Sequence, residues 1–382
     1  MKTKLFVKPL VIALSLIGAG SALADITIGV SVSATGSAAV LGGPQKNTTE
    51  LLPTSIGGEK INWIVLDEAT DPTAAAKNAS KLINENKVDL LIAGSITPNV
   101  MAAAGAAAES KTPLIALAPN PADGEKFKWT FTMPQGIGLM AEGILEHAKA
   151  HNVKTLAFIG YHPDAYGEVW IKALQANVAK YGITFGPIEG FARTDTSVTG
   201  QVVKIISAKP DAVIVVASGA PAAMPHSALT ERGYKGQIYQ THGAPSPAFL
   251  KIGGKNVEGG IIVAGPLIEW DQLPDSHPSK KVGGEYAKLY EAKFGAGSLS
   301  SFGGHMWDAW QIASRAIPVA KKKAKPGTAE FRAALRDAIE SEKEVAGVHG
   351  VFNMSPTNHN GHDARGRVLL QVQNGAFKVI SK

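Results

Sequence analysis

The 382-residue sequence contains no cysteine, which excludes disulfide bonds, cysteine-ligated zinc, iron–sulfur clusters and thiol nucleophiles. Its formal net charge is only +6, and no block of basic residues suggests nucleic-acid binding. Dinucleotide-binding glycine motifs, phosphate-binding loops and nucleophile elbows are also missing. These absences argue against an enzyme, and we predict no cofactor.

Long hydrophobic runs are scarce as well. The apolar run from Pro9 to Ala19 is too short to span a bilayer stably. Lysines precede it, and Ala22 and Ala24 follow at the two positions that a signal peptidase reads. The segment 1–24 therefore has the pattern of a secretory signal peptide, with cleavage expected after Ala24. We expect a soluble protein outside the cytoplasm, with a retained membrane anchor as the alternative.

After this segment, short apolar stretches alternate with helical patterns. The strand-like stretches are 26–32, 61–66, 88–93, 114–118, 155–159, 212–217 and 237–240. Continuously apolar strands separated by helices are typical of parallel sheets covered on both faces, so the sequence predicts a doubly wound α/β fold. The pattern occurs twice, which indicates two lobes. We expect residues 33–43 to form a loop, the late helices (281–342) to cover the first lobe, and the C-terminal strands to join the second.

Ligands of open parallel sheets bind beyond the carboxyl ends of the strands. Ser95 and Thr97 follow the third strand-like stretch, and Pro98 suits a first helical turn with Thr97 as the N-cap. Hydroxyl groups beside helix N–H groups would bind an anion, most naturally a carboxylate. Plain helix capping is the alternative. Pro119 and Asn120 follow the next strand and offer an amide to the same ligand.

Aromatic and histidine side chains follow strands in the second half of the chain. Tyr161, His162 and Tyr166 come after the strand 155–159, and His242 follows the strand 237–240. The rings could stack on an apolar or aromatic ligand, or they could close the end of the core. His242 could form a hydrogen bond with the ligand or cap a turn.

Two further histidines, His359 and His362, stand close together in a polar segment. They could contribute to a metal site, but this spacing is more typical of a turn, and we predict no metal. A two-lobed exported protein without a catalytic constellation favours capture of a small molecule in a cleft that closes by hinge motion.

Several segments together resemble one known family. They are ITIGV at 26–30 with ATG at 34–36, DEATDPTAA at 67–75, DAYGE at 164–168, FGGHMWDA at 302–309 and GVFNMSP at 350–356. The chain resembles the periplasmic solute-binding proteins of branched-chain amino acid ABC transporters, the leucine/isoleucine/valine-binding type, over nearly its whole length after residue 24.

This resemblance implies the periplasmic binding protein type I fold, in which a three-segment hinge joins two doubly wound parallel-sheet lobes. We expect residues 25–143 and 273–346 in the N-terminal lobe, residues 147–270 and 349–382 in the C-terminal lobe, and the ligand cleft between them. The resemblance also implies a periplasmic monomer that delivers its ligand to a membrane permease.

In the family, positions that match Ser95, Ile96 and Thr97 hold the ligand's α-carboxylate together with the turn from Ala118 to Asn120. The tyrosine that closes over the ligand matches Tyr166.

The departures from the family pattern concern the rest of the ligand. The carboxylate that pairs with an amino acid's ammonium falls at His242, and two aromatic positions fall at Leu41 and Ala220. A buried ammonium without an anionic partner would cost several kcal/mol. We therefore expect a small carboxylate with a bulky apolar or aromatic body and no ammonium. The alternatives are a hydrophobic amino acid as ligand, a ligand sensor for a membrane receptor and, remotely, a secreted hydrolase.

Overall fold

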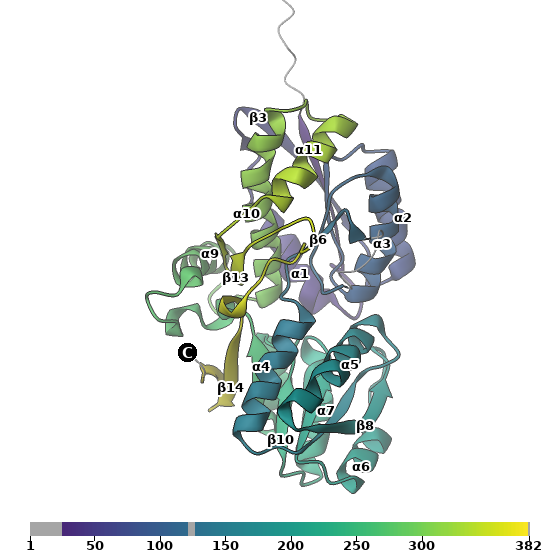
Figure 1. Cartoon of the computed structure of the whole chain (residues 1–382), viewed down its shortest axis with the longest axis vertical. Helices are drawn as coiled ribbons and strands as arrows, with labels where there is room; N and C mark the ends of the chain where they lie inside the picture. Colours follow the sequence, from purple (N-terminus) through teal and green to yellow (C-terminus); the bar gives the residue numbers. More distant parts are fainter. Residues whose placement is uncertain (1–24, 121–126, 381–382) are drawn as a thin grey trace, which may run out of the picture.

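The computed structural model describes residues 25–120 and 127–380, so the predicted signal peptide lies outside the described residues. The strands of the first sheet are β1 (Ile26–Val32), β2 (Ser55–Ile56), β3 (Glu59–Asp67), β4 (Leu90–Ala93), β5 (Leu114–Ala116) and β6 (Thr130–Thr132). They lie in the order β2-β3-β1-β4-β5-β6, and all neighbours are parallel except the short β2. This sheet forms the upper lobe in Figure 1.

The second sheet forms the other lobe. Its strands are β7 (Thr155–Tyr161), β8 (Thr184–Phe191), β9 (Ala212–Val216), β10 (Gln237–Gln240), β11 (Ile261–Ala264), β14 (Val368–Gln373) and β15 (Ala376–Val379). Their order is β15-β14-β11-β10-β9-β7-β8, in which β14 and β15 are antiparallel additions to a parallel sheet. The predicted α/β class with two doubly wound lobes is confirmed.

Helices cover both sheets. The helices of the upper lobe are α1 (Ala39–Thr49), α2 (Pro72–Asn84), α3 (Thr97–Ser110), α10 (Ser301–Lys321) and α11 (Ala329–Glu340), with α9 (Pro278–Phe294) beside them. Those of the lower lobe are α4 (Ile137–Ala150), α5 (Ala165–Asn177), α6 (Thr199–Ser207), α7 (Ala223–Glu231) and α8 (Pro247–Gly253). Among the described residues, no helix is both long and apolar enough to cross a membrane.

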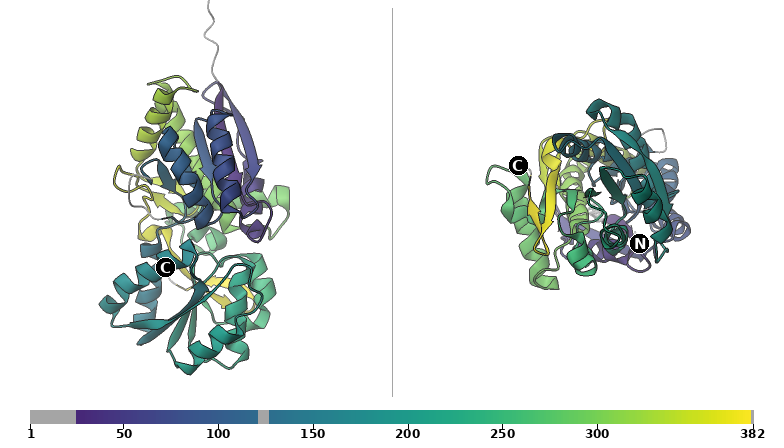
Figure 2. Two further views of the ribbon diagram at one scale, coloured as in Figure 1. Left: turned by 90° about the vertical axis from the view of Figure 1, so that its right-hand side faces the viewer. Right: turned by 90° about the horizontal axis from the view of Figure 1, so that it is seen from below.

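Each lobe has its own core. Ile28 of β1 and Ile92 of β4 share a buried cluster with Ala313 of α10 and Leu335 of α11, so the late helices return to the first sheet as predicted. Leu370 of β14 belongs to the separate core of the second sheet. The terminal strands lie in the lower lobe in the left view of Figure 2.

The three chain crossings between the lobes meet at one buried glutamine. Nε2 of Gln135 donates hydrogen bonds to the carbonyl oxygens of His349, at 3.0 Å, and Gly366, at 2.8 Å. Gly265, which follows β11, also lies against the Gln135 side chain. Segments far apart in the sequence are therefore tied together at the hinge.

The positions of the crossings differ from the expected limits. Residue 143 falls inside α4, whose Met140 and Ile144 pack in the core of the second lobe. Leu267, expected in the C-terminal lobe, packs instead with Tyr286 of α9. Phe352 lies beyond the expected limit at 349 but packs in the first core. An apolar pattern shows that a segment is buried, but it does not show in which of the two cores the segment packs.

Candidate functional site

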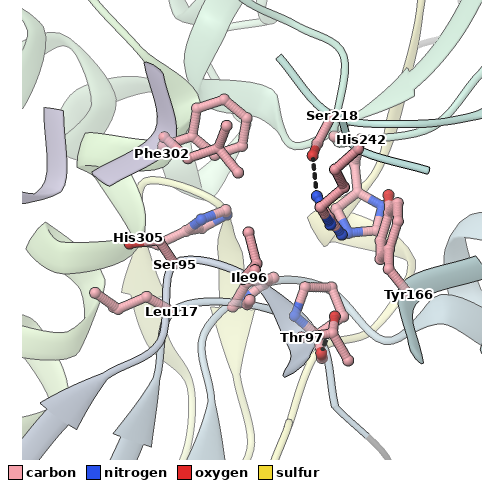
Figure 3. Close-up of a pocket in the computed structure, with 15 residues that line it drawn as sticks. Ser95, Ile96, Thr97, Leu117, Tyr166, Ser218, His242, Phe302 and His305 are labelled. Atoms are coloured by element: carbon pink, nitrogen blue, oxygen red, sulfur yellow. Dashed lines mark hydrogen bonds between the residues drawn. The ribbon is translucent and has the colours of Figure 1, made fainter. Parts of the chain in front are cut away.

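A cavity lies between the two lobes, at the carboxyl ends of their strands, and its free space of about 370 Å³ includes some that is open to solvent. The residues that line it are Leu41, Ser95, Ile96, Thr97, Leu117, Ala118, Pro119, Pro134, Tyr166, Arg193, Ser218, His242, Gly243, Phe302 and His305. Figure 3 shows how side chains from both lobes surround it.

Ser95 and Thr97 lie on the upper-lobe side, where α3 begins. The N-cap is Ile96 and not Thr97 as predicted, and it makes no side-chain capping hydrogen bond, so the capping alternative is wrong. Ser95 Oγ accepts from the backbone N–H of Ser33 at 2.8 Å and donates to Oε1 of Gln45 at 2.6 Å. Thr97 Oγ1 donates to the carbonyl oxygen of Pro119 at 2.6 Å.

A buried carboxylate supports this corner from behind the lining. Glu68 accepts hydrogen bonds from Oγ of Ser33 and the backbone N–H of Ser95, each at 3.0 Å. Burial raises the pKa of the Glu68 carboxyl group. These bonds fix the loop that follows β4. In the first turn of α3, Pro98 has no N–H group and those of Asn99 and Val100 donate to the carbonyl oxygen of Ile96, which leaves the N–H group of Thr97 for a ligand.

Arg193 is a lining residue that sequence reasoning missed. Its Nε and Nη2 donate to the two carboxylate oxygens of Asp164, at 2.9 and 3.1 Å, and Nη1 donates to Ser218 Oγ at 3.3 Å. The guanidinium carbon lies 4.1 Å from the centre of the Tyr161 ring. A guanidinium group has five N–H donors, so two remain for a ligand. Arg193 follows β8, a strand that the apolar pattern did not reveal.

Tyr166 and His242 come from the lower lobe. The Tyr166 hydroxyl lies 2.8 Å from Thr241 Oγ1, and burial raises its pKa to about 12, so it stays protonated at neutral pH. The His242 ring lies between the rings of Tyr166 and Trp170, at 6.3 and 5.9 Å. Burial lowers the pKa of His242 to about 3, so its imidazole is neutral.

The upper lobe adds Phe302 and His305 from the first turns of α10. Their segment contributed to the family resemblance, but neither residue was predicted to line the site, because both lie within a helix and not after a strand. His305 is 3% exposed, and burial lowers its pKa well below the ordinary value. In Figure 3 it lies on the opposite side of the cavity from His242.

Four predicted residues lie outside the lining. Tyr161 stands behind Arg193. His162 places Nδ1 2.6 Å from Oε1 of Glu168, with both side chains 39% exposed. Asn120 donates to Thr132 Oγ1 at 2.7 Å and lines a neighbouring cavity. Ala220 begins a 3-10 helix (Ala220–Ala222). The residue that contacts the upper lobe at this point is the glycine before it, Gly219.

That preceding residue, Gly219, brings the lobes into contact. A Cβ atom added to Gly219 would lie 2.5 Å from Cγ2 of Val40 and 3.2 Å from Cδ1 of Leu41, both on α1. Helix α3 likewise contacts α5 of the other lobe. The cleft is therefore closed around the cavity.

The comparisons with known proteins agree with this architecture. Residues 25–376 match the family described as periplasmic binding protein. The chain belongs to the periplasmic binding protein family. An extracellular ligand-binding receptor from Rhodopseudomonas palustris HaA2 is 45% identical, with a TM-score of 0.92 over 94% of this chain and 100% of that chain. A comparison with curated proteins finds no match.

More distant members share the fold. One is an ABC transporter solute-binding protein from R. palustris in complex with benzoate, with 18% identity and a TM-score of 0.78 over 94% of this chain and 96% of that chain. Another is the branched-chain amino acid substrate-binding protein LivJ from Streptococcus pneumoniae in complex with isoleucine, with 17% identity and a TM-score of 0.74 over 94% and 100%. The predicted family and type I fold are thus confirmed.

The family's fold is that of solute-binding proteins. No group of three or more metal-ligating side chains occurs within residues 25–120 and 127–380. His359 lies between Oε1 of Glu340, 3.0 Å from Nε2, and the carbonyl oxygen of Thr130, 3.1 Å from Nδ1. His362 Nε2 lies 2.9 Å from the carbonyl oxygen of Met133. Both histidines have protein partners near the hinge.

Proposed function

We propose that this chain is the periplasmic ligand-binding component of an ABC importer and that it captures a small carboxylate with an apolar or aromatic body. The ligand enters the open cleft and the lobes close over it. The closed form, with one face contributed by each lobe, then docks on a membrane permease as a monomer. Residues 1–24 direct export and are removed.

The observation that carries the proposal is the charge of the cavity wall. Its described lining contains one guanidinium group, that of Arg193, and no carboxylate. Two N–H donors of Arg193 are available to an anion, and the first turn of α3 contributes the backbone N–H group of Thr97 and the positive end of the helix dipole from the other lobe. A carboxylate thus meets favourable charge on both sides of the cleft.

The same wall disfavours an amino acid. An ammonium group needs a carboxylate within hydrogen-bond distance, and Asp164 is occupied by Arg193 and by the backbone N–H of Tyr166 at 2.8 Å. At the position expected for the ammonium's partner stands His242, which is neutral. Burial of an unpaired ammonium costs several kcal/mol. The benzoate-bound relative supports an acid as ligand, and the isoleucine-bound relative supports the alternative.

Thermal unfolding of the purified protein against a ligand panel tests this proposal. The panel contains benzoate, phenylacetate, 3-phenylpropanoate, aliphatic acids of similar length, leucine and isoleucine. A ligand at about 100 times its Kd stabilises the folded protein by about 2.7 kcal/mol, which raises Tm by several degrees. We expect the shift with one or more of the acids and none with leucine or isoleucine. A shift with leucine alone would refute the proposed ligand class.

A variant of Arg193 sharpens the test. Arg193→Gln removes the charge-assisted hydrogen bonds to the acid, worth about 1.5–3 kcal/mol, so its Kd should rise about 10- to 150-fold. The variant also leaves the Asp164 carboxylate without its cation, so this carboxylate would repel the carboxylate of the ligand. Arg232→Gln is the matched control, because Arg232 is exposed in the same lobe and donates a hydrogen bond to Thr199 Oγ1 at 3.3 Å. Equal affinities of the two variants would contradict the role of Arg193.

A further inference from the structure

His242 and His305 share an unusual condition. They come from opposite lobes, line the same cavity, and are 4% and 3% exposed. In both residues, Nδ1 and Nε2 are buried and neither nitrogen has a hydrogen-bond partner in the protein. A buried polar atom without a partner costs about 1–3 kcal/mol. A merely structural role in the core does not explain why this cost occurs twice at one cavity.

The other histidines of the chain behave differently. Each has at least one ring nitrogen within hydrogen-bond or ion-pair distance of a protein partner. His349, whose ring centre lies 4.2 Å from that of His305, is held by Asp308 at 3.1 Å and Ser301 at 3.0 Å. His226 of the lower lobe is equally buried, and its Nδ1 lies 3.2 Å from Nε2 of Gln240.

The chemistry of the two rings limits what they can bind. Both imidazoles are neutral, because burial and the neighbouring histidines disfavour the charged form. A neutral imidazole has one N–H donor and one nitrogen acceptor. A hydroxyl group also donates and accepts, so it can satisfy either tautomer. An ammonium group would lie among neutral rings in a cavity that already holds the guanidinium of Arg193.

We propose that His242 and His305 are the selectivity pair of the cavity and that they bind a hydroxyl group carried by the ligand in addition to its carboxylate. The ligand class is then a hydroxylated carboxylic acid whose carboxylate and hydroxyl are separated by an apolar body. This inference rests on the proposed function, since it assigns the second polar group of the same ligand. Apolar side chains of the same lining include Ile96, Leu117 and Phe302.

Pairs of acids that differ only in a hydroxyl group test the proposed hydroxyl preference directly. Isothermal titration gives the Kd of benzoate and 3-phenylpropanoate and of the 3- and 4-hydroxy derivatives of each. The wild-type protein should prefer the better hydroxylated acid by about tenfold or more over its parent, because the parent leaves the imidazoles unpaired. His242→Leu and His305→Leu should each reduce this ratio at least about threefold.

Two further variants separate hydrogen bonding from packing. His305→Gln keeps a donor and an acceptor and should restore part of the preference that His305→Leu loses. His226→Leu, which removes an equally buried histidine outside the lining, should keep the wild-type ratio. Far-UV circular dichroism confirms that each variant is folded.

The outcomes distinguish this inference from the proposed function. If none of the acids on either panel binds the wild-type protein, the proposed function fails and the inference fails with it. If acids bind without a hydroxyl preference, or if the preference survives in both leucine variants, the inference is wrong and the proposed function stands.

Discussion

Gly219 offers a test of lobe closure that separates closure from stability. The residue has φ +63 and ψ −149, a conformation that essentially only glycine adopts, and a Cβ atom added to it would lie 2.5 Å from Cγ2 of Val40 in the other lobe. Gly219→Ala therefore has two costs. The backbone cost is present whether the cleft is open or closed, whereas the steric cost exists only when the lobes are in contact.

The two costs have different magnitudes and different readouts. An alanine held in this conformation costs about 1–3 kcal/mol, which lowers Tm by several degrees. Gly254 has φ +50 and ψ −132 with open space around the missing Cβ, so Gly254→Ala has a similar backbone cost without the clash. Overpacking against Val40 adds about 1–3 kcal/mol to the closed form, so Kd of the bound acid should rise about 5- to 150-fold in Gly219→Ala alone.

A double-mutant cycle then identifies the contact. Val40→Ala removes the Cγ2 atom from a side chain that is 37% exposed, so it should have little effect by itself. In the double variant Val40→Ala/Gly219→Ala, most of the lost affinity should return. Isothermal titration with the acid that raises Tm most, together with thermal unfolding, measures both quantities. If Gly219→Ala binds as well as Gly254→Ala, the reasoning about closure is refuted.

Two further predictions concern protons and processing. Burial lowers the pKa of His226 and His362 to about 4, below the ordinary 6.5, so the unfolded chain takes up protons at a higher pH than the folded chain. The stability that each neutral histidine contributes is therefore complete above pH 6.5 and is lost as pH falls toward about 4. The free energy of unfolding should fall by about 1.4 kcal/mol per pH unit for each histidine in this range. Urea unfolding at several pH values should show a smaller slope in His226→Leu, and an unchanged slope would contradict the assignment. The intact mass of the periplasmic protein should correspond to a chain that begins at Asp25, and a mass that includes residues 1–24 would exclude cleavage after Ala24.

Much of the fold could be predicted because buried parallel strands consist of continuous apolar runs in the sequence. The strands β1 and β10 begin and end where the pattern places them. Residues 39–43, which begin helix α1, were expected to belong to a loop, and Gly42, Gly43 and Pro44 are indeed poor helix formers. Tertiary contacts override this preference: Gly42 allows the backbone of Ser33 to approach closely, and Thr48 bonds the hydroxyl of Tyr286 at 2.8 Å.

The candidate site was predictable only where it follows a recognised strand. Ser95, Tyr166 and His242 satisfy that rule and line the cavity. Arg193 was missed because β8 is half-buried and interrupted by glycine and proline, so its apolar pattern is weak. His305 was missed for a different reason. It lies inside α10, and only the return of the chain to the first lobe places it at the cavity.

The distribution of the first core along the chain has a consequence for how the protein forms. Strand β1 is made at the start of the described chain, but the α10 residues that bury its apolar face come from beyond Ser301. The parallel strands β7, β9, β10 and β11, with α4, lie in one continuous stretch, and the antiparallel β14 and β15 join their core from residues 368–379. Contacts between segments far apart in sequence form slowly because loop closure costs entropy. We therefore expect the first sheet, although it is synthesised first, to stay uncovered until the C-terminal helices arrive, and the second sheet to gain its last two strands later still.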